Sequence, residues 1–258
     1  MKRKLSILIA LLVGFYFTNA SFAGTAEDAW LSLVGERFAK RPEFYFIEND
    51  PALPNVLIYG DSISIGYTER VRSQLKGEAN VYRLYRNGSA SNAFVPYVSK
   101  MLETMENEDL QDRWDFEWDV VHFNVGLHDL KYLKNGKLDK ENGQQVSSID
   151  EYKENLHAIV AFLEERFPGA ELVFATTTPV PENADGRFAG DAKKYNEAAL
   201  EVMSEYPAIR INDLYSFAKP HQEEWWVKPG DVHYSELGKN RQGDEVARVI
   251  REALSLAQ

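Results

Sequence analysis

The stretch that decides the fold is Val56-Leu57-Ile58-Tyr59-Gly60-Asp61-Ser62-Ile63-Ser64. Its first four residues form a short apolar run that is typical of a buried β-strand, and the polar residues after Gly60 end that run. A segment with helical spacing follows, from about Ile65 to Leu75. The chain therefore passes from a strand into a helix around Ser62, which predicts a serine hydroxyl exposed at the end of a strand.

The same alternation of strand and helix recurs along the chain. Short apolar runs predict strands at Val56 to Tyr59, Asn80 to Tyr85, Val120 to Val125, Leu172 to Ala175 and Ile209 to Ile211. Helical spacing predicts helices at Ile65 to Leu75, Val95 to Glu106, Ile149 to Phe167, Asp191 to Tyr206 and Ser235 to Ala257. Alternating elements of this length imply right-handed crossovers and a mostly parallel sheet. The sequence therefore predicts an α/β protein, a three-layer α/β/α sandwich around five strands.

The N-terminal segment has the pattern of a signal peptide. Three basic residues, from Lys2 to Lys4, precede an apolar stretch from Leu5 to Phe17, and Ser21-Phe22-Ala23 resembles a cleavage site. The apolar stretch is too short to span a bilayer comfortably, and an uncleaved anchor is the alternative. We expect a signal peptide over 1–23, a single domain over 24–258, and a periplasmic or secreted location.

Composition restricts the chemistry and the partners of the protein. The chain has no cysteine, so neither a disulfide nor a thiolate nucleophile is available. Its formal net charge is −11, no run of lysine or arginine occurs, and removal of the leader takes away three basic residues. A negative field repels polyanions, so we expect neither nucleic acid nor, after signal removal, a membrane as partner. The oligomeric state is not predicted.

Polar residues with catalytic potential follow the predicted strands. In open parallel sheets the loops beyond the carboxyl ends of the strands share one surface. Ser62 at a helix N-terminus would meet backbone N–H groups suited to an oxyanion, and Asp231-Val232-His233 near the end of the chain supplies an acid and a base. The alternative for Ser62 or Asp61 is a simple helix cap. The set predicts a serine hydrolase.

The motifs resemble those of the GDSL or SGNH hydrolase family. Gly60-Asp61-Ser62 is not a Gly-x-Ser-x-Gly elbow, but it is similar to the nucleophile block of that family. Three further blocks follow in order: Asn87 to Asn92, Gly126-Leu127-His128-Asp129, and Asp231-Val232-His233. The resemblance covers about Asn55 to Leu254. It implies a flavodoxin-like sheet, Ser62, His233 and Asp231 as catalytic residues, and no cofactor or metal.

Three departures from the family pattern affect the expected roles. Asn92 stands where the family usually has glycine, so the N–H of Asn92 or that of Gly88 completes an oxyanion hole with the Ser62 N–H. His128 replaces the usual asparagine, and an imidazole N–H can donate the same hydrogen bond. A single residue separates Asp231 from His233, which leaves a backbone carbonyl as the alternative orienting group.

The variant block Gly-Leu-His-Asp resembles a branch found in bacteria that degrade polysaccharides. The resemblance implies an esterified carbohydrate as substrate, with acetyl the expected group. We expect Trp225 and Glu182 to contact this substrate, Trp225 as a stacking platform. The alternatives are that the adjacent Trp225 and Trp226 bury one ring and half-expose the other, and that Glu182 is a solvated loop charge. Two alternatives remain open: a lipase or thioesterase of the same family, and a carbohydrate-binding protein whose catalysis is impaired.

Overall fold

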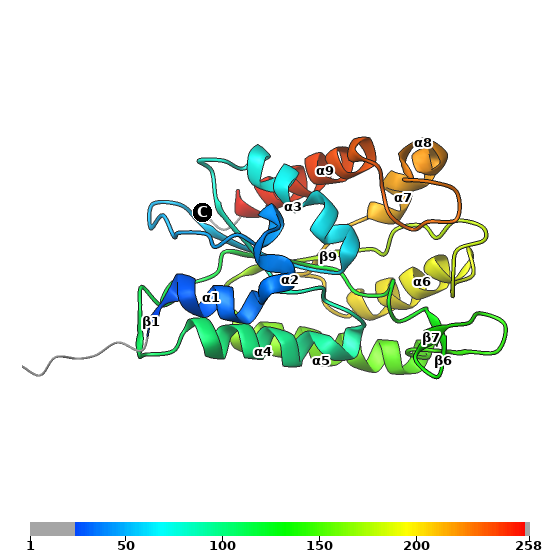
Figure 1. Ribbon diagram of the computed structural model, residues 1–258, viewed down its shortest axis with the longest axis horizontal. Helices are drawn as coiled ribbons and strands as arrows, with labels where there is room; N and C mark the ends of the chain where they lie inside the picture. Colours follow the sequence, from blue (N-terminus) through cyan, green and yellow to red (C-terminus); the bar gives the residue numbers. More distant parts are fainter. Residues whose placement is uncertain (1–23, 256–258) are drawn as a thin grey trace, which may run out of the picture.

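The computed structural model describes residues 24–255, so the predicted signal peptide at 1–23 lies outside the described residues. A five-stranded sheet forms the centre of the molecule (Figure 1). Its strands are β2 (Asn55–Tyr59), β3 (Asn80–Arg83), β5 (Val120–Phe123), β9 (Glu171–Ala175) and β10 (Arg210–Asn212). They run parallel in the order β10-β9-β5-β2-β3, which is the flavodoxin-like order.

Helices cover both faces of this sheet. The long ones are α3 (Ser62–Gln74), α4 (Phe94–Met105), α5 (Ile149–Arg166), α6 (Asp191–Met203) and α9 (Glu236–Leu254). Helices α3 and α9 lie together on one side, and α4, α5 and α6 lie on the other (Figure 1). This arrangement confirms the predicted three-layer sandwich. The five strands and five long helices lie within three residues of their predicted positions.

Helix α3 begins three residues earlier than the apolar spacing predicts. The Asp61 carboxylate accepts the N–H of Ile63 at 2.9 Å, and so satisfies one of the free donors at the helix N-terminus. The cap therefore places Ser62 inside the helix as its first residue.

The remaining elements are short. At the N-terminal end lie β1 (Gly24–Thr25), α1 (Ala26–Val34), α2 (Glu36–Ala39) and the 3₁₀ helix η1 (Pro42–Phe44), and β1 pairs with β4 (Leu110–Gln111). Before α9 lie α7 (Leu214–Ala218), η3 (Lys219–His221) and α8 (Gln222–Trp225). A small antiparallel sheet joins β6 (Tyr132–Lys134), β7 (Lys137–Leu138) and β8 (Gln144–Gln145). Asn135 and Gly136 have φ of 52° and 74°, as the turn between β6 and β7 requires.

The core lies on both sides of the central sheet. Strands β2, β3 and β5 are buried along their whole length, as expected of strands covered on both faces. Within residues 24–255, no helix combines the length and the apolar character needed to cross a membrane.

Candidate active site

Ser62 lies at the junction between β2 and α3. Gly60 precedes it, and a Cβ there would lie only 2.8 Å from the Cβ of Ser64, so the tight turn requires glycine. Ser62 is half-buried, whereas Asp61 and Ile63 on either side are buried. The turn therefore leaves the serine accessible at the positive end of a helix.

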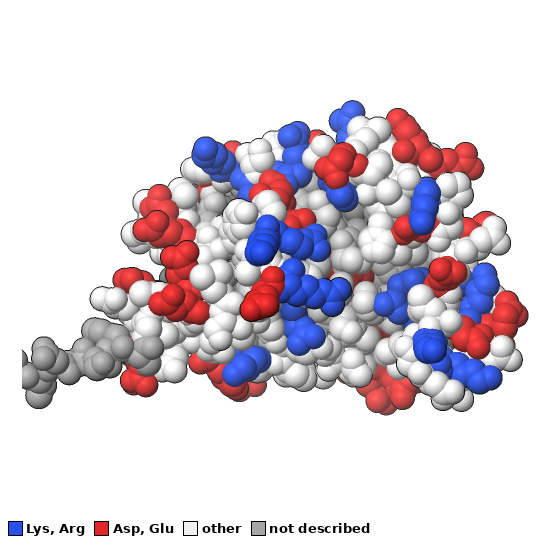
Figure 2. Space-filling model, in the orientation of Figure 1, with Lys and Arg blue, Asp and Glu red and all other residues white. Residues whose placement is uncertain are grey.

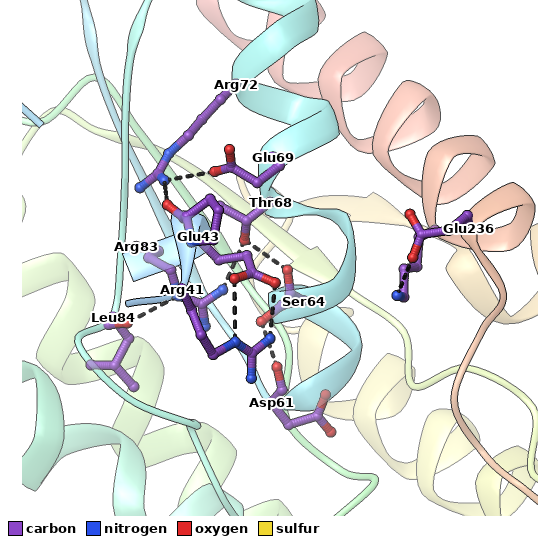
Figure 3. A network of polar contacts seen from close by, with 12 residues as sticks. Arg41, Glu43, Asp61, Ser64, Thr68, Glu69, Arg72, Arg83, Leu84 and Glu236 are labelled. Carbon is purple, nitrogen blue, oxygen red and sulfur yellow. Dashed lines mark hydrogen bonds and ion pairs between the residues drawn. The ribbon is translucent and has the colours of Figure 1, made fainter. Parts of the chain in front are cut away.

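A chain of buried polar contacts fixes the first turns of α3 (Figure 3). The Ser64 hydroxyl donates to the Asp61 carbonyl at 2.8 Å, and the Thr68 hydroxyl donates to the Ser64 carbonyl at 2.7 Å. Arg83, fully buried on β3, donates to the Thr68 hydroxyl at 2.8 Å and lies 4.6 Å from the centroid of the Phe44 ring. These contacts tie the turn that carries Ser62 to the neighbouring strand.

His233 lies between Ser62 and Asp231. Its Nε2 is 3.0 Å from the Ser62 hydroxyl oxygen, and its Nδ1 is 2.7 Å from a carboxylate oxygen of Asp231. Both distances are within hydrogen-bonding range, so the three side chains form a continuous line. The structure thus brings together the three residues predicted to be catalytic, although 171 positions separate Ser62 from His233.

The short spacing between Asp231 and His233 is accommodated by an Asx turn. The same Asp231 oxygen that meets the His233 ring also accepts the backbone N–H of His233 at 3.0 Å. Burial raises the pKa of Asp231, but these two hydrogen bonds outweigh it and leave the pKa below its ordinary value. A carboxylate therefore faces the ring, and the alternative of an orienting backbone carbonyl is not needed.

The backbone around His233 is also fixed. The His233 carbonyl accepts the N–H of Val227 at 2.9 Å, and the Trp225 carbonyl accepts the N–H of Ser235 at 2.7 Å. These bonds flank an isolated bridge between Trp226 and Tyr234. The loop that carries the acid and the base is therefore held on both sides.

The loop after β3 contains the two residues considered as oxyanion donors. The Gly88 N–H already donates to the Gly60 carbonyl at 3.0 Å, so it is not available to a ligand. Asn92 lies in the 3₁₀ helix η2 (Ser91–Ala93), and within residues 24–255 its N–H has no hydrogen-bond partner. The geometry therefore favours Asn92 over Gly88.

Asp129 fixes the position of this loop. Its carboxylate accepts the backbone N–H of Ser91 at 3.0 Å, the Ser91 hydroxyl at 2.5 Å and the Ser147 hydroxyl at 2.8 Å. Asp129 is completely buried, and these bonds satisfy a carboxylate that would otherwise be costly to bury. Asp129 thus holds η2 from the loop after β5.

His128 lies in the loop after β5 with two basic neighbours. The Lys131 Nζ is 2.8 Å from the His128 Nδ1, and Arg187 donates to the Leu127 carbonyl at 3.1 Å. Burial lowers the pKa of His128 to about 4, and the charges of Asp61 and His233 are close enough to act on it. The imidazole is therefore neutral at neutral pH and lies within reach of the charges of Asp61 and His233.

The two residues expected to contact substrate lie in different surroundings. Trp225 is only 5% exposed, and the His221 ring stacks on its indole at a centroid distance of 4.4 Å. This burial corrects the expectation that Trp225 offers a free stacking face. Glu182 is exposed and lines a pocket of about 900 Å³, together with the half-buried Trp226. The segment from Lys228 to Gly230, which leads into Asp231, forms one wall of this pocket.

The sequence assigns no role to Asp129 or Lys131, and it offers Arg187 only as a residue that reads substrate hydroxyls or as a solvated loop charge, whereas in the structure Arg187 donates to the Leu127 carbonyl. Asp129 closes the Gly126-Leu127-His128-Asp129 block and Arg187 follows the fourth predicted strand, but their contacts with Ser91 and Leu127 come from loop packing that the sequence pattern does not give. Lys131 follows His128 by three positions, a separation that permits contact within one turn. Within residues 24–255, no cluster of three or more His, Cys, Asp or Glu side chains is arranged to hold a metal ion.

Comparison with known proteins identifies relatives of the chain. The model of the GDSL-like lipase/acylhydrolase family matches residues 58–241. A GDSL esterase/lipase of Arabidopsis thaliana is 29% identical over 126 residues, which are 43% of this chain and 52% of that protein. The match therefore spans about half the length of this relative.

Solved structures share the fold at low sequence identity. A lipase/acylhydrolase from Enterococcus faecalis has a TM-score of 0.59 at 16% identity, covering 77% of this chain and 96% of its own. The acetylxylan esterase Axe2 from Geobacillus stearothermophilus has a TM-score of 0.54 at 15% identity, covering 78% of this chain and 94% of its own. At such identities the likeness shows the fold.

Proposed function

The chain belongs to the GDSL-like lipase/acylhydrolase family, and we propose that it is a secreted serine esterase that removes acetyl groups from a carbohydrate. The observation that carries the proposal is the line from Ser62 through His233 to Asp231, with contacts of 3.0 and 2.7 Å. A nucleophile, a base and an orienting acid in this order are what acyl transfer through a serine requires.

The proposed reaction starts with proton transfer from Ser62. His233 Nε2 accepts the hydroxyl proton as the serine oxygen attacks the ester carbonyl, and Asp231 stabilises the imidazolium. The imidazolium then protonates the departing sugar hydroxyl, which leaves an acyl group on Ser62. Water deprotonated by His233 attacks this acyl-enzyme, and collapse of the second intermediate releases acetate and regenerates the serine.

Three donors are proposed to stabilise the oxyanion that forms in both steps. They are the backbone N–H groups of Ser62 and Asn92 and the ring N–H of His128. The free Asn92 N–H supports this assignment, as does the neutral state of His128, which a pKa of about 4 maintains at neutral pH. The helix dipole of α3 acts in the same direction at Ser62.

The pocket beside the site supports a carbohydrate rather than a long acyl chain as the bound group. Its lining mixes the rings of Tyr215 and Trp226 with charged side chains, Glu182 among them. Rings and hydrogen-bonding groups suit a sugar, whereas an acyl chain needs a continuous apolar groove. A structural relative named as an acetylxylan esterase provides a further reason to test acetylated sugars first.

A catalytically impaired carbohydrate-binding protein remains the alternative from another functional class. Its grounds are the short spacing between Asp231 and His233 and the unusual His128. The Asx turn at Asp231 argues against the first ground, because the carboxylate reaches the ring at 2.7 Å. The second ground is weakened because an imidazole can donate as an amide does.

The test compares ester classes with purified protein. Acetate release from a panel of acetylated polysaccharides is measured beside hydrolysis of p-nitrophenyl acetate and of a long-chain p-nitrophenyl ester. We expect preference for acetyl esters, acetate release from at least one polysaccharide, and labelling of Ser62 by a fluorophosphonate. Preference for the long-chain ester would support the lipase alternative, and glycan binding with neither turnover nor labelling would support the binding protein.

We also propose that the protein is exported and that its partner is the ester substrate rather than a nucleic acid or a membrane. The leader pattern at 1–23 and the net charge of −11 support this proposal. On the face drawn in Figure 2, acidic and basic side chains are interspersed, without a broad basic surface. Localisation of a tagged full-length chain in cell fractions tests export.

A further inference from the structure

Lys131 and His128 contact each other directly through their side chains. The ammonium nitrogen of Lys131 lies 2.8 Å from Nδ1 of the His128 ring. The lysine is half-buried, and its carbonyl accepts the N–H of Val146 at 2.9 Å, which fixes its backbone beside β8. A half-buried lysine that bonds to a histidine rather than to a carboxylate calls for an explanation, because opposite charges are its usual partners.

The protonation state of His128 determines which group donates in the hydrogen bond between Lys131 and His128. Burial lowers its pKa to about 4; the charge of Asp61 opposes this shift, and those of Lys131, Arg187 and His233 add to it. The ring is therefore neutral at neutral pH. A neutral imidazole carries one N–H, on either Nδ1 or Nε2, and the bonds that it makes decide which.

The lysine decides the tautomer. An ammonium group has three donors and no acceptor, so a hydrogen bond to Nδ1 requires that Nδ1 carry a lone pair and Nε2 the proton. We infer that Lys131 is a positioning residue that holds His128 as the Nε2–H tautomer, the form able to donate to the oxyanion. Within residues 24–255, Nε2 of His128 has no hydrogen-bond partner, and it is not one of the polar side-chain atoms that are buried without a partner.

The catalytic part of this inference rests on the proposed esterase function. An asparagine amide always presents an N–H, whereas a neutral histidine presents one at Nε2 in only one of its two tautomers. A histidine in the oxyanion hole therefore needs a neighbour that selects the tautomer, and Lys131 is the side chain in contact with its other nitrogen. Arg187 supports the same loop differently, through the Leu127 carbonyl at 3.1 Å.

The first test reads the tautomer without any substrate. Protein labelled with ¹⁵N-histidine is studied by NMR at pH 7, and the His128 signals are assigned by their loss in His128→Asn. We expect a protonated Nε2 and an unprotonated Nδ1 in the wild type, and a shift towards protonated Nδ1 in Lys131→Met. A wild-type ring protonated at Nδ1, or a tautomer that does not respond to Lys131→Met, would overturn the inference.

The second test measures steady-state kinetics with an acetyl ester. Loss of one oxyanion donor costs about 10²–10³ in kcat, and Lys131→Met leaves some molecules in the useful tautomer, so we expect a fall of about 10- to 100-fold. KM should change little, because the oxyanion bond exists only in the transition state. Lys131→Arg should restore most of kcat. Lys137→Met, an exposed lysine on β7, is the matched control and should behave as wild type.

A double-mutant cycle separates positioning through His128 from a direct effect of the charge. In the His128→Asn background, Lys131→Met should cause little further loss, because no tautomer remains to be selected. An equal loss in both backgrounds, or wild-type kcat in Lys131→Met, would contradict the positioning role. Absence of ester turnover and of fluorophosphonate labelling in the wild type would instead overturn the proposed function and the catalytic part of this inference, and the NMR result would still decide the tautomer.

Discussion

The N–H of Gly88 donates a hydrogen bond to the carbonyl of Gly60, with a distance of 3.0 Å between nitrogen and oxygen. A Cβ at Gly88 would lie 2.7 Å from the ring of Tyr59, so the two loops approach too closely for any other residue. This contact connects the loop after β3 to the turn that carries Ser62. It also occupies the donor that would compete with Asn92 for an oxyanion.

Replacement of Asn92 tests whether its backbone or its side chain acts. Asn92→Gly and Asn92→Ala keep the N–H, and the side chain is exposed, so we expect both variants to retain near wild-type kcat for acetyl esters. Steady-state assays with p-nitrophenyl acetate measure the effect. A large fall in kcat in both variants, with folding intact by circular dichroism, would assign the role to the carboxamide instead.

Removal of the nucleophile or the base is expected to abolish most turnover. Ser62→Ala and His233→Ala should each lower kcat by about 10³-fold or more, because the residues of such a unit act together. Ser73→Ala, an exposed serine of the same helix, is the matched control. Initial rates and fluorophosphonate labelling are measured on folded protein. Wild-type turnover in either variant would remove that residue from the mechanism.

Asp231→Asn distinguishes the two hydrogen bonds of Asp231, one to the backbone N–H of His233 and one to its ring. The amide oxygen can still accept the His233 N–H, so the turn is expected to persist, but the negative charge facing the ring is lost. We expect kcat to fall by about 10²- to 10⁴-fold with a nearly unchanged melting temperature. Asp109→Asn, at an exposed position, serves as control. If kcat remained at the wild-type value, the orienting role of Asp231 would be excluded.

We expect kcat to fall at alkaline pH, because Lys131 loses its proton there. Burial lowers the pKa of Lys131 to about 8, with Arg187 adding to the shift and Asp61 and Asp129 opposing it. The protonated lysine is the active form, so kcat should decrease as pH rises through about 8. Above that pH the neutral amine of Lys131 can accept a hydrogen bond from Nδ1–H of His128, so the lysine no longer selects the Nε2–H tautomer.

The control for this pH profile is Lys131→Arg. A guanidinium keeps its proton throughout the accessible range, so this variant should retain its kcat beyond the point at which the wild type declines. Rates are corrected for spontaneous ester hydrolysis at each pH. An identical alkaline decline in both proteins would assign it to another group.

Thr68→Val should destabilise the fold through Arg83. The hydroxyl of Thr68 accepts a bond from the buried guanidinium at 2.8 Å, and valine would leave that donor unpaired. We expect a loss of about 1–3 kcal/mol in the free energy of unfolding, measured in urea. Thr104→Val is the control, since its hydroxyl makes the same helical bond to Lys100 without an arginine. Equal losses in both variants would show that Arg83 adds nothing.

The local sequence was enough to predict the layers of the fold. In a chain of alternating strands and helices, an apolar run such as Val56 to Tyr59 forms a buried strand of a parallel sheet. The carboxyl ends of parallel strands then lie along the same edge of the sheet. The position of Ser62 follows from that edge, whereas His233 lies in the loop between α8 and α9 and was predicted from its motif. The small sheet of β6, β7 and β8 was not predicted, because strands of two or three residues carry no periodicity that spacing can reveal.

Contacts between loops were beyond the reach of sequence reasoning. Whether Trp225 or Trp226 is covered depends on His221, which stacks on Trp225 from a preceding turn. Asp129 likewise meets Ser91 across 38 positions of the chain. Such contacts depend on how the loops pack in three dimensions, and composition or local spacing does not specify this packing.

The acid and the base of the site belong to one three-residue turn. Because Asp231 bonds to both the backbone and the ring of His233, a displacement of this segment would carry both groups as a unit. The contact that would lengthen first is the one between the ring and Ser62, which comes from a different part of the chain. Loss of that one contact would leave the serine without its base, while the imidazole stays paired with its carboxylate.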